Sequence, residues 1–252
     1  MIGVELYQML RSRRTWTTIL LIDALPTLVA VLLGLTDGTL FPLAAMAIVL
    51  PLFLPIAVTI QAGDAVAGEA QAGTLRYLLV RPVGRTRLLV AKLVSVMAFV
   101  LLTLVVVAAT AYVVGSLLLG NSDIGTATTV SGTALTQQQL IGRTLLALGY
   151  ALLSMLGVAA IALFLSTVAD SPLGAALGTL AVLVASTLLL TLDAADTLAP
   201  FLPTRYWLAF VDLFRDPILW RDVLRGSLLQ VVYVLVFLGA AWANFTTKDV
   251  TD

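Results

Sequence analysis

Long stretches without any Asp, Glu, Lys or Arg constrain this chain more than any other feature. A helix needs ~20 apolar residues to cross the hydrocarbon core of a bilayer, because it rises about 1.5 Å per residue. Five charge-free runs are long enough, and a sixth run, 15–36, is interrupted only by Asp23. The five are residues 38–63, 93–122, 144–169, 171–192 and 226–247. We therefore predict six transmembrane helices, at about 18–35, 40–62, 92–118, 142–166, 172–192 and 227–245.

The composition supports a membrane protein with an all-α fold. Charged residues make up 11% of the chain and hydrophobic residues 60%, whereas ordinary soluble domains carry about 25% charged residues. A transmembrane β-barrel would show short segments of alternating polarity, but a stretch such as 101–107 is apolar on nearly every side. We therefore expect an all-α integral membrane protein.

Missing residue types exclude much chemistry. The chain has no Cys and no His, so it cannot form a thiol nucleophile, a Ser-His-Asp triad or a His-based zinc site. Its two lysines, Lys92 and Lys248, follow Ala91 and Thr247, so neither belongs to a phosphate-binding G-x-x-x-x-G-K-[ST] loop. A net charge of zero without a basic tract disfavours nucleic-acid binding. We expect no enzymatic activity, no metal and no cofactor in the chain itself.

The distribution of basic residues predicts the orientation. Eight of the fourteen lie before the first predicted span or between the second and third, which places the N-terminus and that loop in the cytoplasm. Six spans then return the C-terminus to the same side. Four arginines between spans five and six oppose this orientation, but five aspartates accompany them.

The chain is expected to form a single domain over 1–252. Residues 1–17 are predicted to form an interfacial helix, because Ile2, Leu6, Met9 and Arg13 share one helical face; a short disordered tail is the alternative. The other expected parts are spans 1–2 (18–62), a cytoplasmic loop (63–91), spans 3–5 (92–192), an extracytoplasmic interfacial segment (193–226), span 6 (227–245) and a cytoplasmic tail (246–252).

The cytoplasmic loop carries the most informative pattern. Thr74 is suited to cap a short helix with an apolar edge formed by Leu75, Leu78 and Leu79, and Pro82 should end it. A short amphipathic helix between two membrane helices suits a groove on another cytoplasmic protein. The alternative is a loop held at anionic lipid by its arginines.

The same residues resemble a known family. The arrangement E-x-x-x-G-T-x-x-x-L-L-x-x-P-x-x-R, formed by Glu69, Gly73, Thr74, Leu78, Leu79, Pro82 and Arg85, resembles the second-loop signature of ABC-2 type transporter permeases. Six spans, cytoplasmic termini, the amphipathic N-terminal segment and the closing residues Phe245, Lys248, Asp249 and Val250 fit the same family over nearly the whole chain.

The resemblance implies a half-transporter. Two such permease subunits, as a homodimer or a heterodimer in the lipid bilayer, would pair with two copies of an ABC ATP-binding subunit that holds ATP and Mg. The loop helix would be the coupling helix that contacts this ATPase. The resemblance assigns that contact to Glu69, Gly73, Thr74, Leu75, Arg76, Tyr77, Leu78, Leu79, Arg81, Pro82 and Arg85.

Three further features each keep two interpretations. Gly174 and Gly178 form a small-x-x-x-small pattern that suits either a dimer interface or packing within the chain. Asp23 must lie near the surface or be paired, since a carboxylate at mid-membrane costs about 2.5–3.5 kcal/mol, and it serves either a transport pathway or anchoring. Pro51 and Pro55 should kink the second span, to open a pathway or to shape packing.

The leading hypothesis is a permease of the prokaryotic plasma (inner) membrane that exports an amphipathic, drug-like or lipid-like compound. The alternative is a mechanotransmission or assembly component that relays ATPase motion without transporting a substrate. An intramembrane enzyme is disfavoured, because Asp23 has no second acidic residue inside a span.

Overall fold

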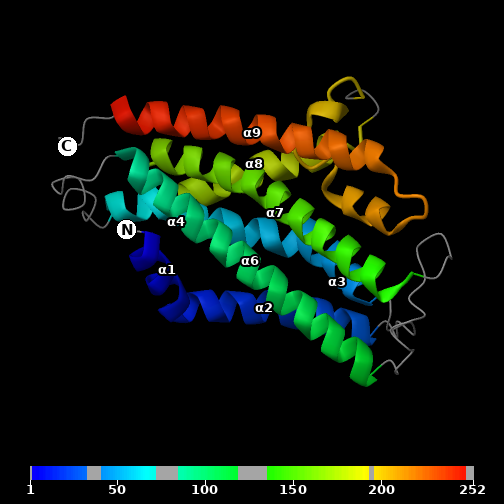
Figure 1. Cartoon of the computed structure of the whole chain (residues 1–252). Helices are drawn as coiled ribbons and strands as arrows, with labels where there is room; N and C mark the ends of the chain where they lie inside the picture. The colour runs from blue at the N-terminus through cyan, green and yellow to red at the C-terminus, as the bar shows by residue number, and fades with distance from the viewer. Residues whose placement is uncertain (1, 33–40, 72–84, 119–134, 193–195, 248–252) are drawn as a thin grey trace.

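The computed structural model of the chain describes residues 2–32, 41–71, 85–118, 135–192 and 196–247, and within these ranges it contains helices and no strand (Figure 1). The elements are α1 (Ile2–Arg11), α2 (Arg13–Leu32), α3 (Phe41–Ile48), η1 (Val49–Phe53), α4 (Leu54–Gln71), α6 (Arg85–Leu118), α7 (Gln137–Val168), α8 (Pro172–Leu189), η4 (Ala199–Phe201), η5 (Trp207–Phe214) and α9 (Trp220–Thr247).

Five helical stretches are long and apolar enough to cross a membrane. They are Ala45–Gln71, Thr86–Val114, Gln138–Val168, Pro172–Leu189 and Trp220–Phe245. The predicted all-α chain with several helices able to span a bilayer is thus confirmed. α2, which carries Arg13, Arg14 and Asp23 over 20 residues, is not among the five, so the sixth span stays a prediction.

Several helices extend beyond their predicted ends. α4 continues to Gln71 instead of ending near 62, and α6 begins at Arg85 instead of 92. The prediction ended each helix near the first charged residue. A helix continues past the hydrocarbon core, however, wherever its charged side chains reach water or an oppositely charged partner. The 34-residue α6 is about 50 Å long, so it exceeds the ~30 Å core. The predicted loop 63–91 is therefore helical at both ends.

α7 forms the centre of the bundle. It packs against α4, α6, α8, α9 and η5, and Figure 1 shows it running between α9 and α6. Its small residues Ala159, Ala160 and Ala162 are fully buried, which allows close approach of neighbouring helices. Thr136 caps its N-terminus in a reciprocal capping box with Gln139, so α7 begins before the predicted residue 142.

The expected irregularity at the two prolines is present. Residues Val49–Phe53, which contain Pro51, form a π-helical segment between α3 and α4, and Pro55 lies in the first turn of α4. Since proline lacks the N–H that an α-helix requires, the regular hydrogen bonding of the second predicted span is interrupted there.

The segment between α8 and α9 differs from the prediction. We expected an interfacial segment over 193–226, but the chain from 220 onward belongs to α9, and η5 buries Trp207, Phe210 and Leu213 in the bundle. η5 packs against both α7 and α9, because burial of these large apolar side chains is favourable there.

Bundle side chains hold this segment through its backbone. Tyr150 of α7 donates a hydrogen bond to the carbonyl of Tyr206 at 2.5 Å, and Gln230 of α9 donates to that of Pro203 at 2.8 Å. Arg143 of α7 donates to the carbonyl of Arg215 at 2.8 Å. These carbonyls thus find donors although the segment lies partly inside the bundle.

Candidate functional site

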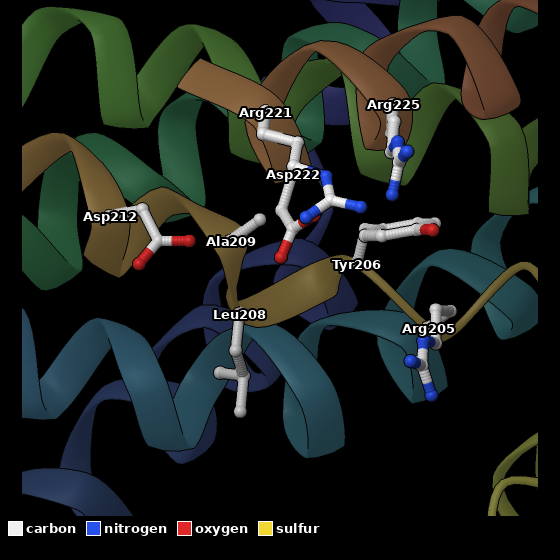
Figure 2. A pocket seen from close by; sticks show the side chains of 8 residues that line it. All are labelled: Arg205, Tyr206, Leu208, Ala209, Asp212, Arg221, Asp222 and Arg225. Atoms are coloured by element: carbon white, nitrogen blue, oxygen red, sulfur yellow. The ribbon is translucent and has the colours of Figure 1, made fainter. Parts of the chain in front are cut away.

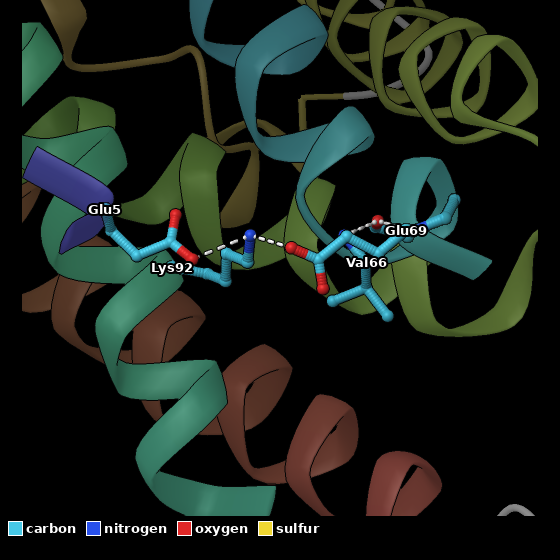
Figure 3. Close-up of polar contacts among 6 residues, drawn as sticks. Glu5, Val66, Glu69 and Lys92 are labelled. Carbon is cyan, nitrogen blue, oxygen red and sulfur yellow. Dashed lines mark hydrogen bonds and ion pairs between the residues drawn. The ribbon is translucent and has the colours of Figure 1, made fainter. Parts of the chain in front are cut away.

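A mostly buried ion-pair cluster joins three helices at the end of the bundle that holds α1. Lys92, in the second turn of α6, lies between the carboxylates of Glu5 from α1 and Glu69 from α4 (Figure 3). The Lys92 Nζ to Glu5 Oε1 distance is 3.0 Å, and the amine also donates a hydrogen bond to Glu69. We call these three side chains the Lys92 cluster. The Lys92 side chain is 11% exposed, that of Glu5 18% and that of Glu69 20%.

A polar cavity of about 370 Å³ adjoins the Lys92 cluster. Its lining includes Gln8, Gln61 and Ser95 together with the cluster itself. On its rim, Asp64 of α4 lies 3.8 Å from a guanidinium nitrogen of Arg14 on α2, and both side chains are well exposed. An exposed pair of this kind contributes little to stability.

The end of α4 is also held by α7. The Ser166 hydroxyl donates to the carbonyl of Gly63 at 2.7 Å and accepts from the backbone N–H groups of Val66 and Ala67. A side chain inserted into helical hydrogen bonding in this way distorts the helix locally. Hydrogen bonds from α7 therefore hold α4 just before Glu69.

A glycine sets the contact between α4 and α8. A Cβ on Gly63 would lie 3.1 Å from the backbone nitrogen of Ala176 and 3.3 Å from the carbonyl oxygen of Pro172. A Cβ at these distances would be unusually crowded, so glycine at this position favours the close approach of the two helix backbones.

Of the residues assigned to the predicted ATPase contact, the structure places Glu69 in the Lys92 cluster and Arg85 at the first position of α6. The others lie outside the described residues: Gly73, Thr74, Leu75, Arg76, Tyr77, Leu78, Leu79, Arg81 and Pro82. The cluster thus joins the two helices that border this stretch, α4 before it and α6 after it.

The other predicted site residues lie apart from the Lys92 cluster. On α8, Gly174 is exposed near its N-cap Ser171, whereas a Cβ on Gly178 would contact Leu165 of α7 at 3.4 Å. Gly178 therefore lies against α7 of the same chain, and its place in a dimer interface stays a prediction. The Asp23 carboxylate lies beside the Thr110 side chain of α6, and within the described ranges it forms no ion pair with an arginine.

Sequence reasoning did not assign Lys92, Glu5 or Gly63 to a site. One signal was available, because Lys92 is one of only two lysines and an amine in an apolar helix needs a counter-charge. The identity of its partners depends on packing. Among the described residues no group of acidic side chains is suited to hold a metal ion.

The comparisons with known proteins place the chain in a family. A family model described as "Protein of unknown function (DUF2705)" matches residues 27–251. The chain belongs to the DUF2705 family. Within this DUF2705 protein the match includes Glu69 and Lys92 but not Glu5. A search of curated proteins finds no match.

Proposed function

We propose that this DUF2705 protein is the transmembrane permease subunit of an ATP-driven ABC exporter. In this proposal a separate subunit binds ATP and Mg and hydrolyses the nucleotide, and α2 is the first of six spans. The proposed coupling helix comprises residues 73–79, with Pro82 as the break after it, and lies on the cytoplasmic side of the plasma membrane of a prokaryote. The resemblance of residues 69–85 to the ABC-2 signature is the sequence basis of the proposal.

The Lys92 cluster is the observation that carries this proposal. A coupling element transmits motion only if the helices on both sides of it move together. Glu69 lies two residues before the end of α4, and Lys92 lies in the second turn of α6. Their ion pair joins the two helices, and Glu5 adds α1 to the same unit.

The low exposure of the cluster strengthens this link. Water and salt screen exposed ion pairs, whereas pairs that are mostly buried are screened much less. A force on the proposed coupling helix would therefore reach α1, α4 and α6 together through the cluster, and α7 and α8 through their own contacts with α4.

Exposed apolar faces accord with a second copy in the bilayer. Leu173, Leu177, Val184 and Leu188 lie exposed along α8, next to Gly174. Such a face suits lipid or another apolar helix. We place the interface between two permease copies on this face of α8 and on α2, where Leu20 and Leu21 are also exposed.

The substrate class follows from the polarity of the bundle. Among the described residues, the fully buried side chains of the central helices are almost all apolar or small hydroxyl residues. A path along such surfaces suits an amphipathic or lipid-like compound better than an ion, because an ion in an apolar interior needs several compensating groups.

The test is co-purification of the tagged chain from its native membrane in mild detergent, followed by mass spectrometry. We expect one P-loop ATPase in about equal amount. Leu78→Asp should abolish its recovery, because the substitution places an unpaired charge in an apolar contact. Leu198→Asp is the matched control, since Leu198 is exposed beyond the far end of α8, and it should retain the ATPase.

Both variants are first compared for their amount in the membrane and for their elution volume. Failure of the unaltered chain to bring down an ATPase would contradict the proposal. Equal recovery of the ATPase with Leu78→Asp and Leu198→Asp would refute the coupling-helix assignment specifically.

A further inference from the structure

A charged pocket lies at the end of the bundle opposite to α1. It has a volume of about 460 Å³ and lies between the start of α9 and the turn leading into η5 (Figure 2). Its polar lining residues are Arg205, Tyr206, Asp212, Arg221, Asp222 and Arg225. In Figure 2 the guanidinium groups of Arg221 and Arg225, both from α9, lie toward the ring of Tyr206.

Positive charge is in excess in this pocket. Within the described part of the chain, Arg205, Arg221 and Arg225 form no ion pair, whereas Asp212 is paired with Arg215 at 2.9 Å. Asp222 is then the remaining carboxylate, and it lies in the first turn of α9, where the helix dipole favours a negative charge. Three guanidinium groups therefore face one carboxylate. Guanidinium is the group best suited to bind phosphate through paired hydrogen bonds.

The pocket continues into an apolar surface on the same helix. Arg221 and Arg225 are four residues apart, and the positions that follow on this face of α9 are Leu228, Val232 and Leu235. All three are more than half exposed, although α9 is long and apolar enough to span a membrane. Arg221 and Arg225 thus lie at the N-terminal end of an exposed apolar stripe that runs along α9.

We propose that this pocket binds the phosphate headgroup of an anionic membrane lipid, whose acyl chains lie along the 228–235 stripe of α9. The arginines supply the charge-assisted contacts to the phosphate, and the stripe supplies the apolar surface for the chains. A free phosphate ion would share only the first of these contacts. This inference requires no ATPase partner and is therefore independent of the proposed function.

Tryptophan quenching by brominated lipids tests the proposal locally. Trp220 is exposed and precedes Arg221, whereas Trp207 is buried. In a Trp16→Phe/Trp242→Phe background, quenching by a lipid brominated in its chains therefore reports mainly on lipid next to the pocket. The full chain is reconstituted in two kinds of vesicle. One contains brominated phosphatidylglycerol and unbrominated phosphatidylcholine, and the other contains brominated phosphatidylcholine and unbrominated phosphatidylglycerol.

We expect phosphatidylglycerol to bind next to Trp220 about tenfold more strongly than phosphatidylcholine, because both lipids carry a phosphate but only phosphatidylcholine carries a choline cation, which the arginines repel. Arg221→Gln/Arg225→Gln should reduce this preference to about one. Arg13→Gln/Arg87→Gln, a pair of exposed arginines in α2 and α6, should leave it unchanged. Asp222→Asn should raise it, a gain that misfolding cannot produce.

Three results would overturn the inference. The first is equal quenching by the two brominated lipids in the unaltered pocket. The second is a preference that survives Arg221→Gln/Arg225→Gln or fails to rise with Asp222→Asn. The third is loss of the preference when millimolar inorganic phosphate is added, which would identify a site for the free ion.

Discussion

Replacing Lys92 by Met tests the central ion pairs of the structure. The substitution keeps most of the side-chain volume but leaves the carboxylates of Glu5 and Glu69 facing each other without a cation. Removing one partner of a buried ion pair costs about 3–5 kcal/mol. Because these carboxylates are 18% and 20% exposed, water compensates in part, and we expect the lower end of that range, about 3 kcal/mol. This corresponds to roughly a hundredfold increase in the unfolding equilibrium constant.

The assay is unfolding of the purified chain in mixed micelles with increasing denaturing detergent, followed by tryptophan fluorescence. Arg87→Met is the matched control, since Arg87 is exposed on α6 and forms no ion pair among the described residues. It should change the unfolding free energy by less than about 0.5 kcal/mol. A third chain combines Lys92→Met with Glu5→Gln and Glu69→Gln, which removes all three charges and should recover most of the lost stability.

The reasoning would be refuted if Lys92→Met were no more destabilising than Arg87→Met. It would also be refuted if the triple variant were as unstable as Lys92→Met, because the loss would then reflect packing of the lysine stem and not unpaired carboxylates.

Two further substitutions test how the bundle is held together. Gly63→Leu should destabilise the chain by about 1–3 kcal/mol or more, because its side chain would meet the backbone of α8. Gly142→Leu is the control, since a Cβ at Gly142 has nothing within 4 Å, and it should be neutral or stabilise by up to about 1 kcal/mol. Equal effects of the two substitutions in the same unfolding assay would contradict the close α4–α8 contact. Gln230→Leu should cost about 1–3 kcal/mol, because it leaves the buried carbonyl of Pro203 without its donor, and it should speed limited proteolysis within 196–219. Tyr233→Phe, which removes a more exposed bond to the same segment, should cost less than about 1 kcal/mol, so an unchanged cleavage rate in Gln230→Leu would argue against the anchoring role of Gln230.

The local pattern of hydropathy predicted five helices that are long and apolar enough to span a membrane. The charge-free run 171–192 begins with the capping residue Ser171, and α8 begins at Pro172 as predicted. The interruption at Pro51 was also predictable, because it follows from a missing N–H in one residue. Helix ends were less accurate wherever a charge lies within a helix, as Asp64 does in α4, since the neighbours of that charge decide whether the helix continues.

The candidate site was only partly predictable. Glu69 was assigned from a local pattern, but its bond to Lys92 joins residues 23 positions apart, and Glu5 is further away still. A sequence pattern does not specify which of the 14 acidic residues will face a given amine. The burial of η5 was likewise missed, because aromatic residues at an interface and aromatic residues in a core have the same composition.

The sequence by itself therefore determined that the described part of the chain contains helices and no strand, that several of these helices are apolar enough to span a membrane, and where the proline interruption lies. Each of these properties depends on residues within one or two helical turns. The tertiary structure alone decided that Lys92 joins α1, α4 and α6, that Gly63 admits α8, and that η5 lies inside the bundle. These properties depend on which surfaces meet, and the free energy of such contacts arises only when distant segments are packed together.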